Sequence, residues 1–333
     1  MCGIVGYIGT RQAFTMYSPM RLVHVDILKG LAIIGIVLQH CNFHIVTENL
    51  NVAVFFMVSG YFFKEEGMGM ISEKRASQLI IPYLWFVLLF FLTKWLFYYL
   101  EEQILLESLR RAIKEIHLFK QCIILHKSIW FLPVLFVMTI LYRGVRYVKN
   151  ERVVLGIVLF SYLLGSLLDN YWHLRVIYLS GSVLSGMIYF HFGYMLKIHE
   201  RELDRVNSGL LLIILVIWCS LTLTLEPDHS YKDNIHPIYL PLMVIPSIIA
   251  LFILLKRRGN HKIAKPFVLA GVYSLGVLGY HSLCNIVMDE TEVDKMVGMN
   301  AIPYMRFITL LLLVPVLIYI TNRFIPFTIG KRM

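Results

Sequence analysis

The chain has 333 residues, of which 58% are hydrophobic and 16% are charged, and its mean hydropathy is +0.70. Soluble domains are about half apolar and about a quarter charged, so this composition excludes an ordinary soluble domain and indicates a polytopic membrane protein. The net charge of +10 is explained by the Lys and Arg residues that usually mark the cytoplasmic loops of membrane proteins. No nucleic-acid partner is therefore expected. The five cysteines show no C-x-x-C spacing, so no metal site or disulfide framework is predicted.

The first residues, MCGIVGYIGTRQAFT, place a Cys directly after the initiator Met and contain no recognisable signal peptide. Residues 1–13 resemble the start of glutamine amidotransferases of the glucosamine-6-phosphate synthase kind, in which an N-terminal Cys is the nucleophile. That chemistry needs a sizeable soluble domain around the Cys, whereas a membrane helix is predicted soon afterwards. We therefore predict that residues 1–21 are a non-functional cytoplasmic appendage, with Met20 favoured as the authentic initiator.

Ten apolar segments follow, and several are short against the roughly 20 residues that a helix needs to cross a bilayer. They form a predicted all-α membrane domain over residues 22–325, followed by a cytoplasmic tail at 326–333. The segments lie at residues 27–45, 50–63, 79–100, 129–142, 153–168, 176–196, 208–225, 238–255, 267–288 and 300–322. The fourth is the least secure because it is short and contains Pro133.

The distribution of basic residues tests this count. With both termini in the cytoplasm, most of the 31 Lys and Arg residues fall on cytoplasmic segments, as the positive-inside rule requires. Removing the fourth span would place KRRGNHK on the outside. Ten spans in the cell inner (plasma) membrane, with both termini cytoplasmic, therefore fit best.

The loop at residues 101–128 is the exception, because it is basic and predicted to lie outside. Its apolar residues recur at helical spacing, and Glu107 and Arg111 are placed to pair at i, i+4. We expect an amphipathic helix on the outer membrane surface, and a lid over a substrate site is the alternative.

The first span, VHVDILKGLAIIGIVLQHCNFH, carries the ionisable residues that point to chemistry. Lys29 and His40 are almost three helical turns apart, so both project from one face, about 16 Å apart along the axis. Asp26 joins Lys29 at i, i+3. This spacing suits a donor that enters from the cytoplasm and an acceptor nearer the far side.

At these residues the chain resembles acyltransferase family 3, the integral-membrane O-acyltransferases of surface sugars. The family hallmark is a basic residue, then ten residues, then His on the first helix. The basic residue here is Lys29, as in the branch that resembles fucose 4-O-acetylase. FFMVSGYFFK, KRASQLIIPYLW, SIWFLPVLF and YSLGVLGYHSL match later family segments in order.

The resemblance implies transfer of an acyl group, most often acetyl from acetyl-CoA, to a hydroxyl of a glycan or lipid-linked sugar. His40 is then the general base or a transient acyl carrier, two roles that stay open. Lys29, Lys74 and Arg75 are expected near the CoA phosphates, and the alternative for each is an ordinary charge that sets the membrane topology. No tightly bound cofactor is expected, and the partners are the acyl-CoA donor, the sugar acceptor and membrane lipids.

The remaining candidates have structural alternatives. Ser59 fits close helix packing better than chemistry. Trp130 either lines the acceptor site or anchors the helix at the membrane interface. His281 matches a family position, and a hydrogen-bonded core histidine is the alternative. For the chain as a whole, the alternative function is a polytopic glycan transporter or flippase, although no internal repeat of the transporter kind is visible.

Overall fold

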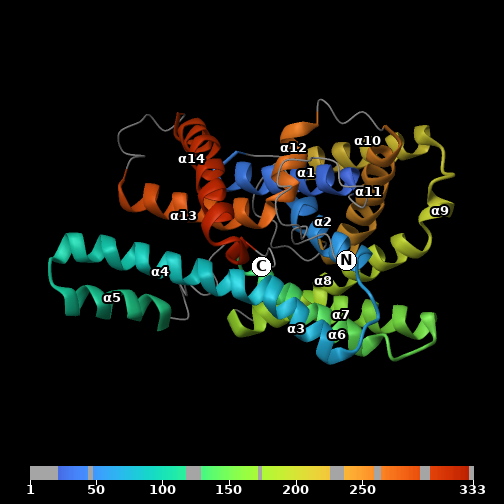
Figure 1. The fold of residues 1–333 in the computed structure, drawn as a ribbon. Coiled ribbons are helices and arrows are strands. Elements are labelled where there is room, and N and C mark those ends of the chain that lie inside the picture. Colours follow the sequence, from blue (N-terminus) through green and yellow to red (C-terminus); the bar gives the residue numbers. More distant parts are fainter. Residues whose placement is uncertain are drawn as a thin grey trace.

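The computed structural model describes residues 22–43, 48–117, 129–171, 175–225, 236–258, 264–292 and 301–329. Within these ranges every regular element is a helix (Figure 1). The elements are α1 (Val23–His40), α2 (Glu48–Tyr61), α3 (Met68–Arg75), the π-helix η1 (Ala76–Ile80), α4 (Ile81–Glu102), α5 (Leu105–His117), α6 (Phe131–Val145), α7 (Glu151–Tyr171), α8 (Arg175–Ile198), α9 (Glu200–Leu203), α10 (Ser208–Leu225), α11 (His236–Arg258), α12 (Lys265–Val272), α13 (Ser274–Glu290), α14 (Ile302–Phe324) and the 3-10 helix η5 (Pro326–Ile329). The predicted appendage at residues 1–21 lies outside the described residues.

Each of the ten predicted spans coincides with a helix or with a pair of consecutive helices. Within the described ranges, four helices are long and apolar enough to cross a membrane. The count rises to five if α12 and α13, which meet at an angle of 82°, form one broken span. Shorter apolar helices at Leu50–Tyr61, Phe131–Val145 and Ser208–Thr222 include the insecure fourth segment. The all-α membrane class is thus supported, while ten crossings and cytoplasmic termini stay predictions.

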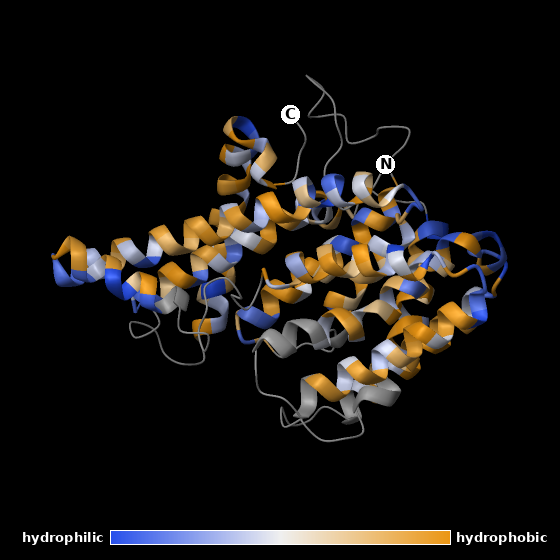
Figure 2. Ribbon diagram, turned by 90° about the horizontal axis from the view of Figure 1, so that it is seen from below, coloured by the Kyte–Doolittle hydropathy of each residue, from blue (hydrophilic) through white to orange (hydrophobic). Residues whose placement is uncertain are grey.

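Hydrophobic residues run along the helices, and hydrophilic residues gather toward their ends (Figure 2). Large apolar side chains remain exposed on the outer helices, for example Leu84 and Leu88 of α4 and Leu311 and Leu312 of α14. Such surfaces are unfavourable in water and are suited to lipid.

The first helix ends earlier than predicted, at His40 instead of residue 45. The N–H of Phe43 bonds to the carbonyl oxygen of Leu38, and that of Asn42 bonds to Gln39. Asn42 adopts a left-handed conformation with φ of 64°, which Asn tolerates better than most residues. This C-terminal cap stops the helix and leaves His40 as its last residue.

The third predicted span is part of a 35-residue helical segment, Met68–Glu102, interrupted by η1. Pro82 has no N–H to offer the carbonyl four residues earlier, and just before it the N–H of Ile81 bonds five residues back, to Ala76. At 1.5 Å per residue the segment measures about 50 Å, longer than the roughly 30 Å apolar core of a bilayer. Part of it therefore has to extend beyond that core or tilt strongly within it.

The amphipathic helix predicted after residue 101 is present as α5, but it folds back along α4 (Figure 1). Arg111 bonds to Glu101 and Glu102 at the end of α4, and its guanidinium lies 4.1 Å from the Tyr98 ring centroid. Arg111 therefore pairs with these α4 carboxylates in place of the predicted partner, Glu107. The two helices form a hairpin beside the rest of the bundle.

Glycines bring two helix pairs into backbone contact. A Cβ atom built on Gly30 of α1 would lie 1.8 Å from the carbonyl oxygen of Phe267 in α12, and one on Gly271 would lie 1.8 Å from that of Asp26. Gly60 of α2 and Gly193 of α8 form an equivalent pair. Small residues at such contacts let the helices approach closely in a membrane, and here they fix α1 against α12 and α2 against α8.

Contacts between helix ends give the bundle two distinct ends. His24 of α1 and Tyr61 of α2 both pack on Phe252 of α11, with ring centroids 4.9 and 5.2 Å apart. The start of α1 therefore lies with the ends of α2 and α11. We name this the basic end, because Lys64, Lys74, Arg75, Arg143, Arg146, Lys197 and Lys256 lie on the segments that meet there.

The opposite, far end holds the end of α1 and the start of α14. Phe43 packs edge-on against Tyr304 at 5.2 Å, and Arg306 of α14 pairs with Asp289 of α13 at 2.5 Å. Lys94 of α4 pairs with Glu290. The first helix thus runs from one charged end of the bundle to the other.

Gly193→Ala tests the backbone contact between α2 and α8. The added Cβ would lie 1.9 Å from the carbonyl oxygen of Met57, so we expect a loss of about 1–3 kcal/mol in stability, typical of overpacking. Gly156→Ala on α7 is the matched control, because its Cβ meets nothing within 4 Å. The measurement is the unfolding temperature in detergent, and equal temperatures for the two variants would contradict the packing.

Candidate active site

The first helix brings Lys29 and Asp26 together inside the bundle, near the basic end. The Lys29 Nζ atom lies 3.7 Å from an Asp26 carboxylate oxygen, and Lys29 is only 1% exposed. Burying an ammonium group in an apolar interior is costly unless a partner compensates its charge. The nearby carboxylate supplies that compensation, so the predicted i, i+3 pair is present.

His40 and His281 meet at the far end. The Nδ1 atom of His40 lies 2.7 Å from Nε2 of His281, although the two residues are 241 positions apart in the sequence. His281 is fully buried, whereas His40 is partly exposed. Two of the predicted site residues therefore form one polar pair, and the buried Ser282 hydroxyl lies 3.5 Å from the same Nε2 atom of His281.

A small pocket lies at the basic end, between the segment that follows α2 and helix α3. Its lining combines aromatic and apolar side chains with three cations and one carboxylate, namely Phe62, Phe63, Lys64, Glu66, Ile71, Lys74 and Arg75. Lys74 pairs with Glu66 at 3.3 Å, and Arg75 is buried. The structure thus places Lys74 and Arg75 together, at the opposite end of α1 from His40.

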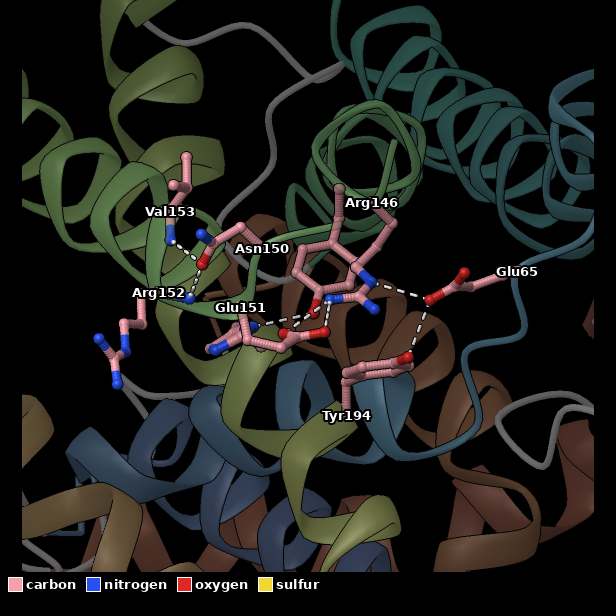
Figure 3. Close-up of polar contacts among 9 residues, drawn as sticks. Glu65, Arg146, Asn150, Glu151, Arg152, Val153 and Tyr194 are labelled. Carbon is pink, nitrogen blue, oxygen red and sulfur yellow. Dashed lines mark hydrogen bonds and ion pairs between the residues drawn. The ribbon is translucent and has the colours of Figure 1, made fainter. Parts of the chain in front are cut away.

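Polar contacts anchor the segment 62–67 that forms one wall of this pocket (Figure 3). Arg146 Nε and the Tyr194 hydroxyl both donate to the same oxygen of Glu65 at 2.8 Å. Arg146 also pairs with Glu151 at 2.8 Å, and Arg143 donates to the backbone carbonyl of Glu66. The segment is therefore bound directly to α8 and to the C-terminal end of α6, and Arg146 links it indirectly to α7.

The electrostatics of Glu65 and Arg146 agree with this fastening. Partial burial disfavours the charged carboxylate of Glu65, but the hydrogen bonds from Tyr194 and Arg146 outweigh it and lower the pKa of Glu65. Partial burial likewise disfavours the guanidinium, while the bonds to Glu151 and Glu65 raise the pKa of Arg146. Both groups stay charged at neutral pH.

A second cluster fixes the end of α2 next to the pocket. Glu200 of α9 accepts hydrogen bonds from the Tyr61 hydroxyl at 2.9 Å and from Lys197 at 3.0 Å, and it pairs with Lys256 at 2.8 Å. Burial opposes ionisation, but these three donors together lower the pKa of Glu200 to about 2. One carboxylate therefore holds the ends of α2, α8 and α11.

The other predicted residues lie elsewhere. Ser59 is fully buried in α2 and donates to the carbonyl oxygen of Phe55 at 2.6 Å, next to the Gly60 contact with α8. Its position is that of a helix-packing residue. Trp130 precedes α6 and packs, partly buried, against the hydrophobic core.

Sequence reasoning missed Glu66 and the aromatic wall of Phe62 and Phe63. The signal was visible in FFKEEG, where two carboxylates follow a Lys directly after an apolar helix. Pairing of Glu66 with Lys74, eight residues later, depends on the turn into α3. In the part of the chain that the structure describes, no group of three or more His, Cys, Asp or Glu is arranged to hold a metal ion.

A comparison with known protein families shows which family the chain belongs to. Residues 22–327 match the family described as an acyltransferase domain, acyltransferase family 3. The chain belongs to this family. No curated protein and no solved structure gives a significant match.

Family membership makes the protein a membrane acyltransferase and confirms the resemblance to acyltransferase family 3. The similarity to the fucose 4-O-acetylase branch stays a prediction. The match begins just before α1 and ends within η5, so it takes in the His40–His281 pair, Lys29 and the basic pocket. The transporter alternative receives no support from the comparison.

Replacing Glu200 by Gln should lower stability in a pH-dependent way. The pKa of Glu200 is lowered from 4.5 to about 2 in the folded protein, so its contribution is fully present above pH 4.5 and is lost as the pH falls toward 2. The difference in unfolding temperature between wild type and Glu200→Gln should therefore be constant above about pH 5, which is half a pH unit above the ordinary pKa of 4.5. Below that pH the difference should shrink.

Glu202→Gln, on the same short helix and largely exposed, is the control and should follow the wild-type curve. A difference for Glu200→Gln that stays constant down to the lowest accessible pH would contradict the role of its ionised carboxylate.

Proposed function

We propose that the protein is an O-acyltransferase that moves an acyl group, most simply acetyl, from acyl-CoA to a hydroxyl of a surface glycan or lipid-linked sugar. The observation that carries the proposal is the single helix α1, which leads from the basic pocket to the His40–His281 pair. An acyl-CoA donor carries charged phosphates at one end and a thioester at the other. It therefore suits a phosphate site and a reacting histidine that lie at opposite ends of α1.

The pocket at the basic end suits the phosphates of CoA. Lys64, Lys74 and Arg75 supply positive charge, and charged hydrogen bonds to phosphate are among the stronger polar contacts in proteins. In the absence of the donor, the ammonium group of Lys74 is ion-paired with Glu66. By the positive-inside rule this end faces the cytoplasm, where acyl-CoA is made, in a multi-pass plasma-membrane protein.

The proposed chemistry takes place at His40. Its imidazole accepts the proton of the acceptor hydroxyl while the oxygen attacks the carbonyl carbon of the thioester. The carbon–sulfur bond then breaks, the thiolate of CoA takes up the proton, and the products are the acyl ester and the free thiol. Because His40 is the last residue of α1, the partial negative charge of the helix C-terminus favours the imidazolium formed during the reaction.

Lys29 lies between the pocket and His40 in this scheme. Its buried ammonium is balanced by Asp26, so it is held in place along the face of α1 that the donor arm follows. We assign it to positioning of the donor, with no part in proton transfer.

His40→Ala should abolish acyl transfer without loss of membrane insertion. A general base contributes about 10²–10⁴-fold to rate, so the variant should release thiol from acetyl-CoA at no more than about 1% of the wild-type rate. Mass spectrometry of surface glycans should show the loss of an acyl mass increment. His199→Ala, which removes an exposed histidine at the basic end, is the control, and an active His40→Ala enzyme would refute the mechanism.

Lys74→Met should raise KM for acetyl-CoA by about tenfold, the size of a lost charged hydrogen bond, with a smaller effect on kcat. The increase in KM should be absent with acetyl-pantetheine, a donor that has no adenosine phosphates. Arg152→Met, a change at an exposed residue near the start of α7, is the matched control. An equal increase in KM with both donors would show that the CoA phosphates bind elsewhere.

A further inference from the structure

The His40–His281 pair has a defined direction, which can be derived from its hydrogen bonds. The two ring planes are within 17° of parallel and the ring centroids are 4.9 Å apart. That separation is close to the 2.7 Å N···N distance plus the radii of two imidazole rings. The geometry fits an edge-to-edge N–H···N hydrogen bond, in which one ring donates and the other accepts.

The backbone decides which nitrogen of His281 carries its proton. Nδ1 of His281 lies 2.9 Å from the carbonyl oxygen of Val277, one helical turn earlier in α13. A carbonyl oxygen only accepts hydrogen bonds, so Nδ1 of His281 has to be the protonated nitrogen. In the neutral ring the other nitrogen, Nε2, then holds the lone pair, and it is Nε2 that faces His40.

We infer that His281 is a positioning residue that holds His40 as its Nδ1–H tautomer and thereby leaves Nε2 of His40 as the proton acceptor. This inference rests on the proposed function, in which His40 is the general base. The Val277 carbonyl orients His281, and His281 orients His40. The second nitrogen of a reactive histidine is commonly fixed by such a partner, which determines the tautomer.

Burial supports this division of roles. His281 is fully buried, with Nδ1 on the Val277 carbonyl and Nε2 facing His40 at 2.7 Å. The Ser282 hydroxyl lies farther from Nε2, at 3.5 Å, and donates to the Leu278 carbonyl. His40 is only partly buried, so it is the member of the pair that a substrate can approach. The reacting histidine is therefore His40, and His281 acts through it.

The surroundings of His281 hold it rigidly. A Cβ on the nearby Gly279 would lie 2.1 Å from the Phe86 ring of α4, so this glycine is what allows α4 to pack there. Tyr280 hydrogen-bonds to Thr321 of α14 and packs edge-on against Phe86. Helix α13 is thus fixed from two sides at the turn that carries His281.

The pair also keeps proton transfer balanced. During the reaction Nε2 of His40 takes the proton from the acceptor hydroxyl and later returns it to the sulfur of the leaving CoA. The Nδ1–H of His40 remains bonded to His281 throughout and shares the positive charge of the imidazolium. His281 itself gains and loses no proton, because its Nδ1–H stays on the Val277 carbonyl.

Two substitutions separate positioning from structural support. His281→Leu removes the acceptor for the His40 Nδ1–H, so we expect kcat to fall by about 10²-fold, the lower limit for loss of a general base, while KM for the donor changes little. His281→Gln places an amide oxygen near the position of Nε2 and should restore most of kcat. His191→Leu, at another buried histidine, which pairs with Tyr142, is the matched control and should leave kcat unchanged.

Nitrogen-15 NMR of histidine-labelled protein provides the direct readout. The His40 signals, assigned by their absence from His40→Gln, should report the Nδ1–H tautomer in the wild type and in His281→Gln. In His281→Leu they should report a mixture or the Nε2–H form. This readout does not depend on turnover.

The outcomes distinguish this inference from the proposed function. Unchanged kcat in His281→Leu, or an Nε2–H tautomer for His40 in the wild type, overturns the positioning role while acyl transfer stands. A loss of kcat in His281→Leu with the His40 tautomer unaltered also overturns it. If His40→Ala retains activity, it is the proposed function that fails.

Discussion

The arrangement of the bundle depends on one constraint, that polar side chains among apolar helices need partners within the protein. Lys29 meets it with Asp26, and His40 meets it with His281. The remaining charges gather at the two ends, where Arg146, Glu200 and Arg306 are each ion-paired. Because an unpaired polar group is costly in such surroundings, the pairs that join different helices help to hold them together: His40–His281 joins α1 to α13, and Arg306–Asp289 joins α14 to α13.

Much of the fold could be predicted from local sequence. Long apolar runs predicted the ten apolar segments that the structure shows as helices, and the spacing of Lys29 and His40 placed both on one face of α1. The short helices α3 and α9 have no such run and were not predicted. The end of α1 could not be predicted from hydropathy, because residues 41–45 remain largely apolar and the stop depends on the left-handed conformation of Asn42. The turn between α12 and α13 was missed for a similar reason, since KPFVLAGVYSLGVLGYHSL reads as one continuous apolar stretch.

The candidate site was only half visible in the sequence. Residue types and the family resemblance singled out His40 and His281, but their contact joins positions 241 residues apart and follows from the packing of α13 beside α1. The fastening of segment 62–67 by Arg146 and Tyr194 likewise joins helices distant in sequence. Local patterns identify reactive residue types, whereas their partners are set by tertiary packing.

The uneven helix lengths have a consequence for the lipid around the protein. Helices α2 and α6 have 14 and 15 residues, whereas the segment from Met68 to Glu102 has 35. A bilayer that adapts to the short helices has to thin locally, while the long segment has to tilt or extend beyond the apolar core. The stability of the protein should therefore vary with the acyl-chain length of the surrounding phospholipids, and membranes of different thickness should favour it to different degrees.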